Sequence, residues 1–356
     1  PVAWLFLIED GENGEKLYYD RRGVSKTARP ELCFQHIPGF RTPDWAKGAV
    51  MYQIFVDRFR DGNSANDVDT DEYLYIGLPV QHIENWDEKP SAFDVGYFYG
   101  GDLSGVREKF AYLKDLGVEV IYFNPLFVSP SNHKYDTQDY EHIDPHLTVI
   151  AEDGGELLPA EAGDNLNATR YQKRSADPKN LEASDRFFAA FTEEAHRFGF
   201  RILLDGVFNH CGSFHKWLDR EKIYAREGGY APGAYLTPDS PYRKYFVFAD
   251  KRPEAWPDNK SYDGWWDNDT LPKLNYEASP ELAEQILEVG EKWLKPPYQV
   301  DGWRLDVAAD LGHSPDYNHS FWQRFRSRVK AVREDALILA EHYGSPVSWL
   351  NGREWD

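Results

Sequence analysis

Residues 279–305 read SPELAEQILEVGEKWLKPPYQVDGWRL, and they combine a helix signal with a strand signal. Ser279 is a favourable N-cap residue, and Pro280 suits the first position of a helix. The apolar residues that recur at helical spacing after them are Leu282, Ile286, Val289 and Trp293. The run Val300–Leu305 then predicts a buried strand. A helix followed by a buried strand is the repeating unit of an α/β fold.

The same alternation extends along most of the chain. Further buried strands are predicted at 49–56, 118–123, 202–208 and 336–340. Helices are predicted between these strands. The inward-facing residues are Val106, Phe110 and Leu113 in a helix that begins at Ser104. In the other two helices they are Phe187, Phe191 and Phe198, and Phe321, Phe325, Val329 and Val332. Strict alternation implies right-handed parallel crossovers, in either a (β/α)8 barrel or a doubly wound sheet.

Residues 211–278 favour the barrel. This connection is far longer than a usual strand-to-helix loop and is rich in Trp, Tyr, Pro and Gly. We expect an inserted subdomain over the C-terminal face of the sheet, where barrel active sites lie. The predicted fold is therefore an α/β, (β/α)8 TIM-type barrel that occupies residues 41–356 and is present only in its first five or so strands.

Residues 1–40 predict a separate small β unit. Turn residues at 10–11 and 13–14 precede Lys16–Tyr19, which indicates a hairpin. We interpret the segment as the remnant of an N-terminal β-sandwich with its linker, and strands that pad the next domain are the alternative. The chain starts at Pro1 with no initiating methionine, so we expect a piece of a longer protein.

Composition excludes several classes of function. The chain has 356 residues with 40 Lys+Arg and 60 Asp+Glu, a formal net charge of −20, and no basic run that would suit nucleic acid. No apolar stretch reaches the about 18 residues that a membrane span needs. Two cysteines, Cys33 and Cys211, cannot build a disulfide framework. The compartment and the oligomeric state are not readable, and a homodimer of the full-length protein stays an alternative.

Ionisable residues follow three of the predicted strands. Asp205 begins the run that ends in Asn209-His210, Arg304 and Asp306 close the strand at 300–305, and Glu341 follows the strand at 336–340. Because parallel barrel strands end at one mouth, these side chains are expected to meet there. A carboxylate pair with a nearby arginine suits glycoside hydrolysis, where one group attacks and the other donates a proton.

The local sequence also predicts how the two carboxyl groups ionise. Arg304 and Asp306 lie two residues apart on one strand, so both face the same side, and the guanidinium is expected to keep Asp306 ionised. Glu341 follows the apolar run Leu337–Ala340, which is expected to raise the pKa of its carboxyl group.

These segments resemble the short motifs of the alpha-amylase family, glycoside hydrolase family 13, and especially its neopullulanase, cyclomaltodextrinase and maltogenic-amylase branch. The matching segments are Gly117–Pro125, Ser131–Asp136, Asp205–His210, Leu271–Asn275, Gly302–Asp306 and Glu341. The resemblance implies Asp306 as the nucleophile and Glu341 as the general acid/base. It also implies that His210 and Arg304 contact the sugar and that Tyr135 stacks beneath it. The residues implied in supporting positions are Asp136, Asp205 and Asn209.

Two departures from the family pattern are visible. The family places a third carboxylate in an Asn-His-Asp motif, whereas here Asn318-His319 is followed by Ser320 on a predicted helix. The chain also stops at Asp356, before strands six to eight of such a barrel. We therefore expect this fragment alone to be inactive.

The acidic loop at 61–69 suggests a calcium site, because hard oxygen ligands suit Ca²⁺. A solvated acidic loop is the alternative. In the branch that this chain resembles, the corresponding loop and a Gly-Gly-Asp turn hold calcium. The ligands that this implies are Asp61, Asn63, Asn66, Asp67, Gly100 through its carbonyl, and Asp102.

The function implied is a retaining hydrolase of α-1,4 bonds in maltodextrins, cyclodextrins, pullulan or starch, with α-1,6 bonds left open. An α-amylase, an amylopullulanase and a glucanotransferase remain open within the same family. A glucan-binding barrel that has lost catalysis is the alternative from another class.

Overall fold

A five-stranded parallel sheet forms the centre of the computed structural model, which describes residues 2–9, 11, 13–224 and 230–356. Its strands are β6 (Met51–Ile54), β11 (Val120–Phe123), β14 (Arg201–Gly206), β15 (Gly302–Leu305) and β16 (Leu337–Ala340). They pair in chain order, β6 with β11, then β14, β15 and β16, and every pairing is parallel. This is the order and direction predicted for the first five strands of a barrel.

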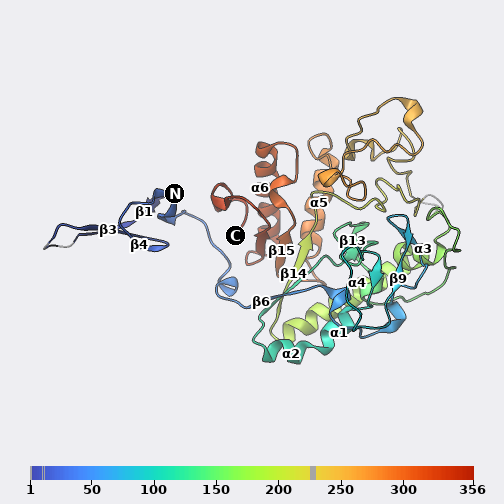
Figure 1. Ribbon diagram of the computed structural model, residues 1–356, viewed down its shortest axis with the longest axis horizontal. Coiled ribbons are helices and arrows are strands. Elements are labelled where there is room, and N and C mark those ends of the chain that lie inside the picture. The colour runs from blue at the N-terminus through green and yellow to red at the C-terminus, as the bar shows by residue number, and fades with distance from the viewer. Residues whose placement is uncertain (1, 10, 12, 225–229) are drawn as a thin grey trace.

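Helices connect successive strands of this sheet (Figure 1). The connecting helices are α1 (Leu103–Glu108) and α2 (Phe110–Asp115), then α3 (Thr169–Ala176) and α4 (Pro178–Arg197), then α5 (Pro280–Lys292), and then α6 (Pro315–Val332). Ser279 caps α5 as predicted, since its hydroxyl accepts from the Leu282 N–H at 3.4 Å. The alternation of strands and helices is thus confirmed.

Two helices differ in detail from the prediction. The first begins at Leu103, because the Asp102 carboxylate caps it, and it breaks at Lys109 into α1 and α2. On α4 the inward residues are Phe188 and Phe191, whereas Phe198 is 41% exposed. Helical spacing alone did not distinguish the buried Phe188 from its half-buried neighbour at position 187, and Phe198 is exposed because it follows the last residue of α4.

The aromatic core fills the space between the sheet and these helices. β11 is buried along its whole length, as expected for a central strand. Phe110 of α2 lies 5.3 Å, between ring centroids, from both Phe191 of α4 and Phe200 before β14. These contacts fix the helices against one face of the sheet.

Long connections leave the C-terminal ends of the first three strands. They carry the short strands β7 (Leu74–Tyr75), β8 (Leu78–Pro79), β9 (Gln81–His82), β10 (Tyr97–Phe98), β12 (Phe127–Val128) and β13 (Asp139–Ile143). Among its described residues, the segment 211–278 between β14 and α5 contains short 3-10 turns and two isolated antiparallel bridges, Phe248 with Tyr262 and Gly264 with Pro272. Several of its aromatic side chains are nevertheless buried, including Trp217, Tyr245 and Trp256, so it packs as part of the main body.

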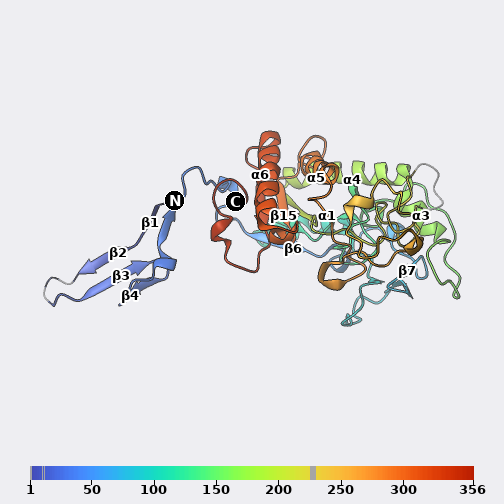
Figure 2. The ribbon, with the colours of Figure 1, turned by 90° about the horizontal axis from the view of Figure 1, so that it is seen from above.

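The N-terminal strands form two small sheets that extend away from this body (Figures 1 and 2). One pairs β1 (Val2–Trp4) with β5 (Phe34–His36), and the other contains β2 (Phe6–Glu9), β3 (Lys16–Asp20) and β4 (Gly23–Ser25). The predicted hairpin is confirmed, because β2 pairs antiparallel with β3, from Phe6 opposite Tyr19 to Glu9 opposite Lys16. Asp10 of its predicted turn lies outside the described residues. None of the helices described is long and apolar enough to span a membrane.

Candidate active site

Three neighbouring strands deliver the predicted site residues to one end of the sheet. The register places Asp205 of β14 opposite Arg304 of β15. Asp306 follows β15 and donates its backbone N–H to Gly206 at 3.1 Å, while the backbone N–H of Glu341 reaches the Leu305 carbonyl at 2.9 Å. The predicted convergence at the carboxyl ends of the strands is therefore confirmed.

Arg304 is the centre of the site. Its Nη1 donates to Asp205 Oδ2 at 2.8 Å and to Asp306 Oδ1 at 2.9 Å, and its Nη2 lies 2.9 Å from Glu341 Oε2. One planar guanidinium thus holds three carboxyl groups in a fixed arrangement. Asp306 and Glu341 face the same side of the sheet, as a pair of reacting carboxyl groups must.

The ionisation of the pair differs from the expectation. Burial raises the pKa of Asp306 to about 8, and the charges of Asp205 and Glu341 act in the same direction, against Arg304. At Glu341 partial burial acts to raise the pKa, but the Val307 N–H, Arg304 and other polar contacts outweigh it, so the pKa is lowered.

The expectation that Arg304 keeps Asp306 ionised while Glu341 holds the proton is therefore wrong for the substrate-free protein. Asp306 is only 9% exposed, whereas the side chain of Glu341 is 24% exposed and receives donors that the sequence did not reveal. The pair retains one proton near neutral pH, because burial and the charges of Asp205 and Glu341 outweigh Arg304 at Asp306. Glycoside hydrolysis needs one protonated and one ionised carboxyl group, and this pair provides both.

Asp205 holds the Arg304 guanidinium in place. It accepts hydrogen bonds from the hydroxyl groups of Tyr122 at 2.5 Å and Tyr135 at 3.1 Å, in addition to Arg304. Burial raises the pKa of Asp205 to about 6, although these donors oppose the shift. The Tyr135 ring centroid lies 5.9 Å from Cζ of Arg304, so the ring borders the carboxyl cluster where a sugar platform was expected.

His210 is buried beneath Tyr135. One ring nitrogen, Nε2, lies 3.0 Å from the Tyr135 carbonyl, and burial lowers the pKa of His210 to about 3, so the ring is neutral. The neutral ring donates from Nε2, which leaves Nδ1 as a buried acceptor with no partner among the described residues. The structure brings His210 next to Tyr135, the expected sugar platform. The His210 ring is only 2% exposed, so it is covered in the substrate-free protein.

Lys273 is a residue that sequence reasoning missed. Its ammonium group, on the inserted segment, contacts Asn209 Oδ1 and the carbonyl oxygens of Asp310 and Leu311, the last at 2.7 Å. Burial lowers its pKa to about 7. The lysine ties the insertion to the ends of β14 and β15, which explains the supporting position of Asn209. Its place within a recognisable motif was visible in the sequence, but its partners were not.

Two further aromatic residues were also missed. The Tyr122 hydroxyl group holds Asp205, and the Tyr343 hydroxyl group donates to Glu341 Oε1 at 2.9 Å. Asp136, expected in a supporting position, accepts from Ser131 and makes no direct contact with the carboxyl pair. The Asn318-His319 pair lies on α6, as predicted, where His319 contacts Glu354 at 3.0 Å.

The candidate calcium residues lie in the loop after β6 and immediately before α1. Asp102 Oδ1 accepts from the backbone of Gly62 and Gly105, and its Oδ2 accepts from Asn66 at 3.2 Å. Asp67 Oδ1 lies against Gly100, where a Cβ atom would come within 2.5 Å of it.

The oxygen atoms of this cluster fit a hard cation. The Oδ1 atoms of Asn66 and Asp67 are buried and have no hydrogen-bond partner among the described residues. Burial raises the pKa of Asp67 to about 7, and the charges of Asp61 and Asp102 add to the shift. The side-chain oxygen of Asn63 also accepts the Ala65 N–H and so caps a short turn. Within the described residues no three His, Cys, Asp or Glu side chains form a metal cluster by themselves, so amide and carbonyl oxygens would have to complete the shell.

Comparison with known proteins gives consistent matches. Residues 53–153 and 183–354 match the family model described as "Alpha amylase, catalytic domain". The chain is 32% identical to a cyclomaltodextrinase of Thermoanaerobacter pseudethanolicus and 33% identical to neopullulanase 2 of Thermoactinomyces vulgaris, and each alignment covers 100% of this chain. It spans 51% and 50% of these relatives, about half of their length.

A solved structure supports the same relationship. The type III pullulan hydrolase from Thermococcus kodakarensis superposes with a TM-score of 0.66 at 28% identity, covering 96% of this chain and 52% of that one. The fold of this chain, with its five parallel strands, therefore has a counterpart in a solved structure.

Proposed function

The chain belongs to the alpha-amylase family, and from this membership we propose that the complete protein is a retaining glycoside hydrolase acting on α-glucans. The proposed substrates are maltodextrins, cyclodextrins, pullulan or starch, cleaved at α-1,4 bonds, with cleavage of α-1,6 bonds left open. The observation that carries the proposal is the single Arg304 guanidinium that holds both Asp306 and Glu341. The names of the relatives, cyclomaltodextrinase and neopullulanase, support the substrate class.

In the proposed reaction the shared proton resides on Glu341 when substrate is bound. Glu341 donates it to the glycosidic oxygen while the Asp306 carboxylate attacks the anomeric carbon and forms a covalent glycosyl-enzyme. Glu341 then removes a proton from water, which attacks the same carbon and releases Asp306. Arg304 supports this cycle because it contacts both carboxyl groups and lets the proton move between them without a change in the site's net charge.

The surrounding residues orient the groups that react. Asp205 fixes Arg304 and the Tyr135 hydroxyl group, and Tyr135 is the proposed platform for the sugar ring. The unpartnered Nδ1 of His210 is the proposed acceptor for a sugar hydroxyl group once the platform shifts. Lys273 holds Asn209, the residue that precedes His210.

Replacement of the nucleophile tests the proposal. In the full-length protein Asp306→Asn should lower kcat on maltotriose or cyclodextrin by about 10³-fold or more, because the amide cannot form the covalent intermediate. Maltotriose binding, measured by calorimetry, should remain. Asp316→Asn, an exposed acid on α6, is the control and should retain full activity. Substantial turnover by Asp306→Asn would assign the nucleophile to another residue.

We also propose that Ca²⁺ binds where the loop after β6 meets α1. The proposed ligands are Asp61, Asn63, Asn66, Asp67, the Gly100 carbonyl and Asp102. The two buried oxygen atoms without partners on Asn66 and Asp67 support this, since buried polar atoms are rarely left unsatisfied. The ion would supply stability to this junction and take no part in bond cleavage.

A further inference from the structure

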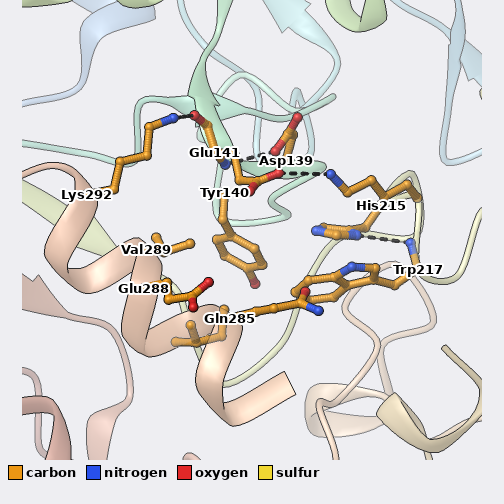
Figure 3. A pocket seen from close by; sticks show the side chains of 11 residues that line it. Asp139, Tyr140, Glu141, His215, Trp217, Gln285, Glu288, Val289 and Lys292 are labelled. Atoms are coloured by element: carbon orange, nitrogen blue, oxygen red, sulfur yellow. Dashed lines mark hydrogen bonds and ion pairs between the residues drawn. The ribbon is translucent and has the colours of Figure 1, made fainter. Parts of the chain in front are cut away.

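A cavity of about 270 Å³ lies between β13, residues 215–217 and helix α5 (Figure 3). None of Asp205, Asp306 and Glu341 lines it, so it is separate from the carboxyl cluster. Its walls combine the rings of Tyr140 and Trp217 with apolar side chains of α5, and its margin carries both acids and lysines.

His215 supplies a buried hydrogen-bond donor to this cavity. Its Nδ1 accepts the Trp217 N–H at 3.1 Å, and burial lowers the pKa of the ring well below its usual value. The neutral ring therefore carries its proton on Nε2, which donates to none of the described residues. Figure 3 shows the ring between Tyr140 and Trp217, with this edge turned toward Tyr140.

Helix α5 supplies acceptors on the opposite side. Gln285 donates its amide to the Tyr245 hydroxyl group at 2.9 Å, which leaves its side-chain oxygen available, and the exposed Glu288 has no partner among the described residues. Lys216 is already neutralised by Glu141 at 3.2 Å. The charge of Lys216, the lysine next to His215 in the chain, is thus compensated and does not favour an anionic ligand.

Aromatic walls, one buried donor and free acceptors are the features that recognise a sugar ring, which has apolar faces and a rim of hydroxyl groups. We propose that this cavity is a second, non-catalytic binding site for one glucose unit of an α-glucan. The choice of glucose among neutral sugars rests on the proposed function. The cavity volume lies just below the range typical of drug-sized ligands, which suits one ring better than an extended chain.

The cavity is linked through one side chain to the segment that carries His210. The Tyr140 hydroxyl group, whose ring forms a wall, lies within hydrogen-bond distance of the carbonyl oxygens of Val207, at 2.9 Å, and His210, at 2.7 Å.

Affinity electrophoresis of the full-length protein through gels containing soluble starch tests the proposal. Glu288→Ala removes an acceptor, and His215→Asn removes the Nε2–H donor but keeps an oxygen near the Nδ1 position to accept the Trp217 N–H. Each should weaken retention by about 3–10-fold, as the loss of one hydrogen bond predicts. Glu281→Ala, an exposed acid on the same helix outside the cavity, should not alter retention.

Hydrolysis of a short chromogenic maltoside, measured in parallel, separates this proposal from the function of the catalytic site. We expect kcat/KM for this small substrate to be unchanged in Glu288→Ala. Loss of retention with no hydrolysis in any variant would reject the hydrolase function and still support the second site. Unchanged retention in Glu288→Ala and in folded His215→Asn would overturn the second site.

Discussion

At the scale of single residues, Arg304 determines the chemistry of the site. Three carboxyl groups surround one guanidinium, and burial, aided by the charges of Asp205 and Glu341, raises the pKa of Asp306 to about 8. Residue identity alone predicted the members of this cluster. It did not predict which of them holds the proton, because that depends on burial and on donors such as the Tyr343 hydroxyl group, which come from the fold.

Asp205→Asn tests the electrostatic coupling. The Asp205 charge raises the pKa of Asp306, so its removal should lower that pKa and free Arg304 to stabilise the ionised pair further. The shared proton is lost as pH rises through this pKa. The alkaline limb of the kcat/KM profile, expected near pH 8 in the parent protein, should therefore move to lower pH.

The profile of the full-length Asp205→Asn protein should be compared with that of Asp115→Asn, an exposed acid on α2. The control should leave the alkaline limb in place. A limb that moves to higher pH in Asp205→Asn, or does not move, would mean that the limb reports another group.

At the scale of elements, local signals predicted the scaffold well and its connections poorly. The Ser279 cap, the five parallel strands and the hairpin of β2 with β3 all follow from neighbouring residues, and all are present. The insertion at 211–278 is held by contacts between residues far apart in sequence. Lys273, for example, reaches Asn209 and Leu311, and no periodicity could reveal such partners.

Lys273→Met tests whether this lysine secures the insertion. The substitution keeps much of the side-chain volume but leaves Asn209 and two carbonyl oxygens without their donor. We expect the free energy of unfolding to fall by about 3 kcal/mol, because unsatisfied buried polar groups cost about 1–3 kcal/mol each. Activity should fall as well, since Asn209 precedes His210.

Urea denaturation of the full-length protein measures the first effect, and kcat with KM the second. Lys260→Met, which changes an exposed lysine of the same insertion, is the matched control and should be neutral. If Lys273→Met were as stable and as active as this control, the lysine would be dispensable.

At the scale of the whole molecule, the sequence predicted which segments meet and the structure adds how they are held. The strand ends were expected to converge because parallel strands share an edge, and Asp205, Arg304, Asp306 and Glu341 do so. The net charge of −20 is compatible with the uncharged substrate proposed. The junction between β6 and α1 is different, because its acidic residues repel one another unless a cation joins them.

Calcium should therefore stabilise the whole molecule through this junction. Binding to the folded state alone adds RT ln(1 + [Ca²⁺]/Kd), about 2.7 kcal/mol when free calcium is one hundred times Kd. Chelation should lower Tm by about 5 °C or more in a domain of ordinary size. Differential scanning calorimetry of the full-length protein, with calcium and with a chelator, measures this shift.

Asp61→Ala is the more informative ligand variant, because Asp102 also caps α1 and its removal would destabilise the helix directly. The side chain of Asp61 accepts only the Asn63 N–H within the described chain, at 2.9 Å, so its loss should abolish most of the calcium response with little other cost. Asp87→Ala, in the same long connection but outside the cluster, should keep the full response. If chelation leaves Tm unchanged in the parent protein, the orphaned oxygens of Asn66 and Asp67 are satisfied by water, and the acidic loop is simply solvated.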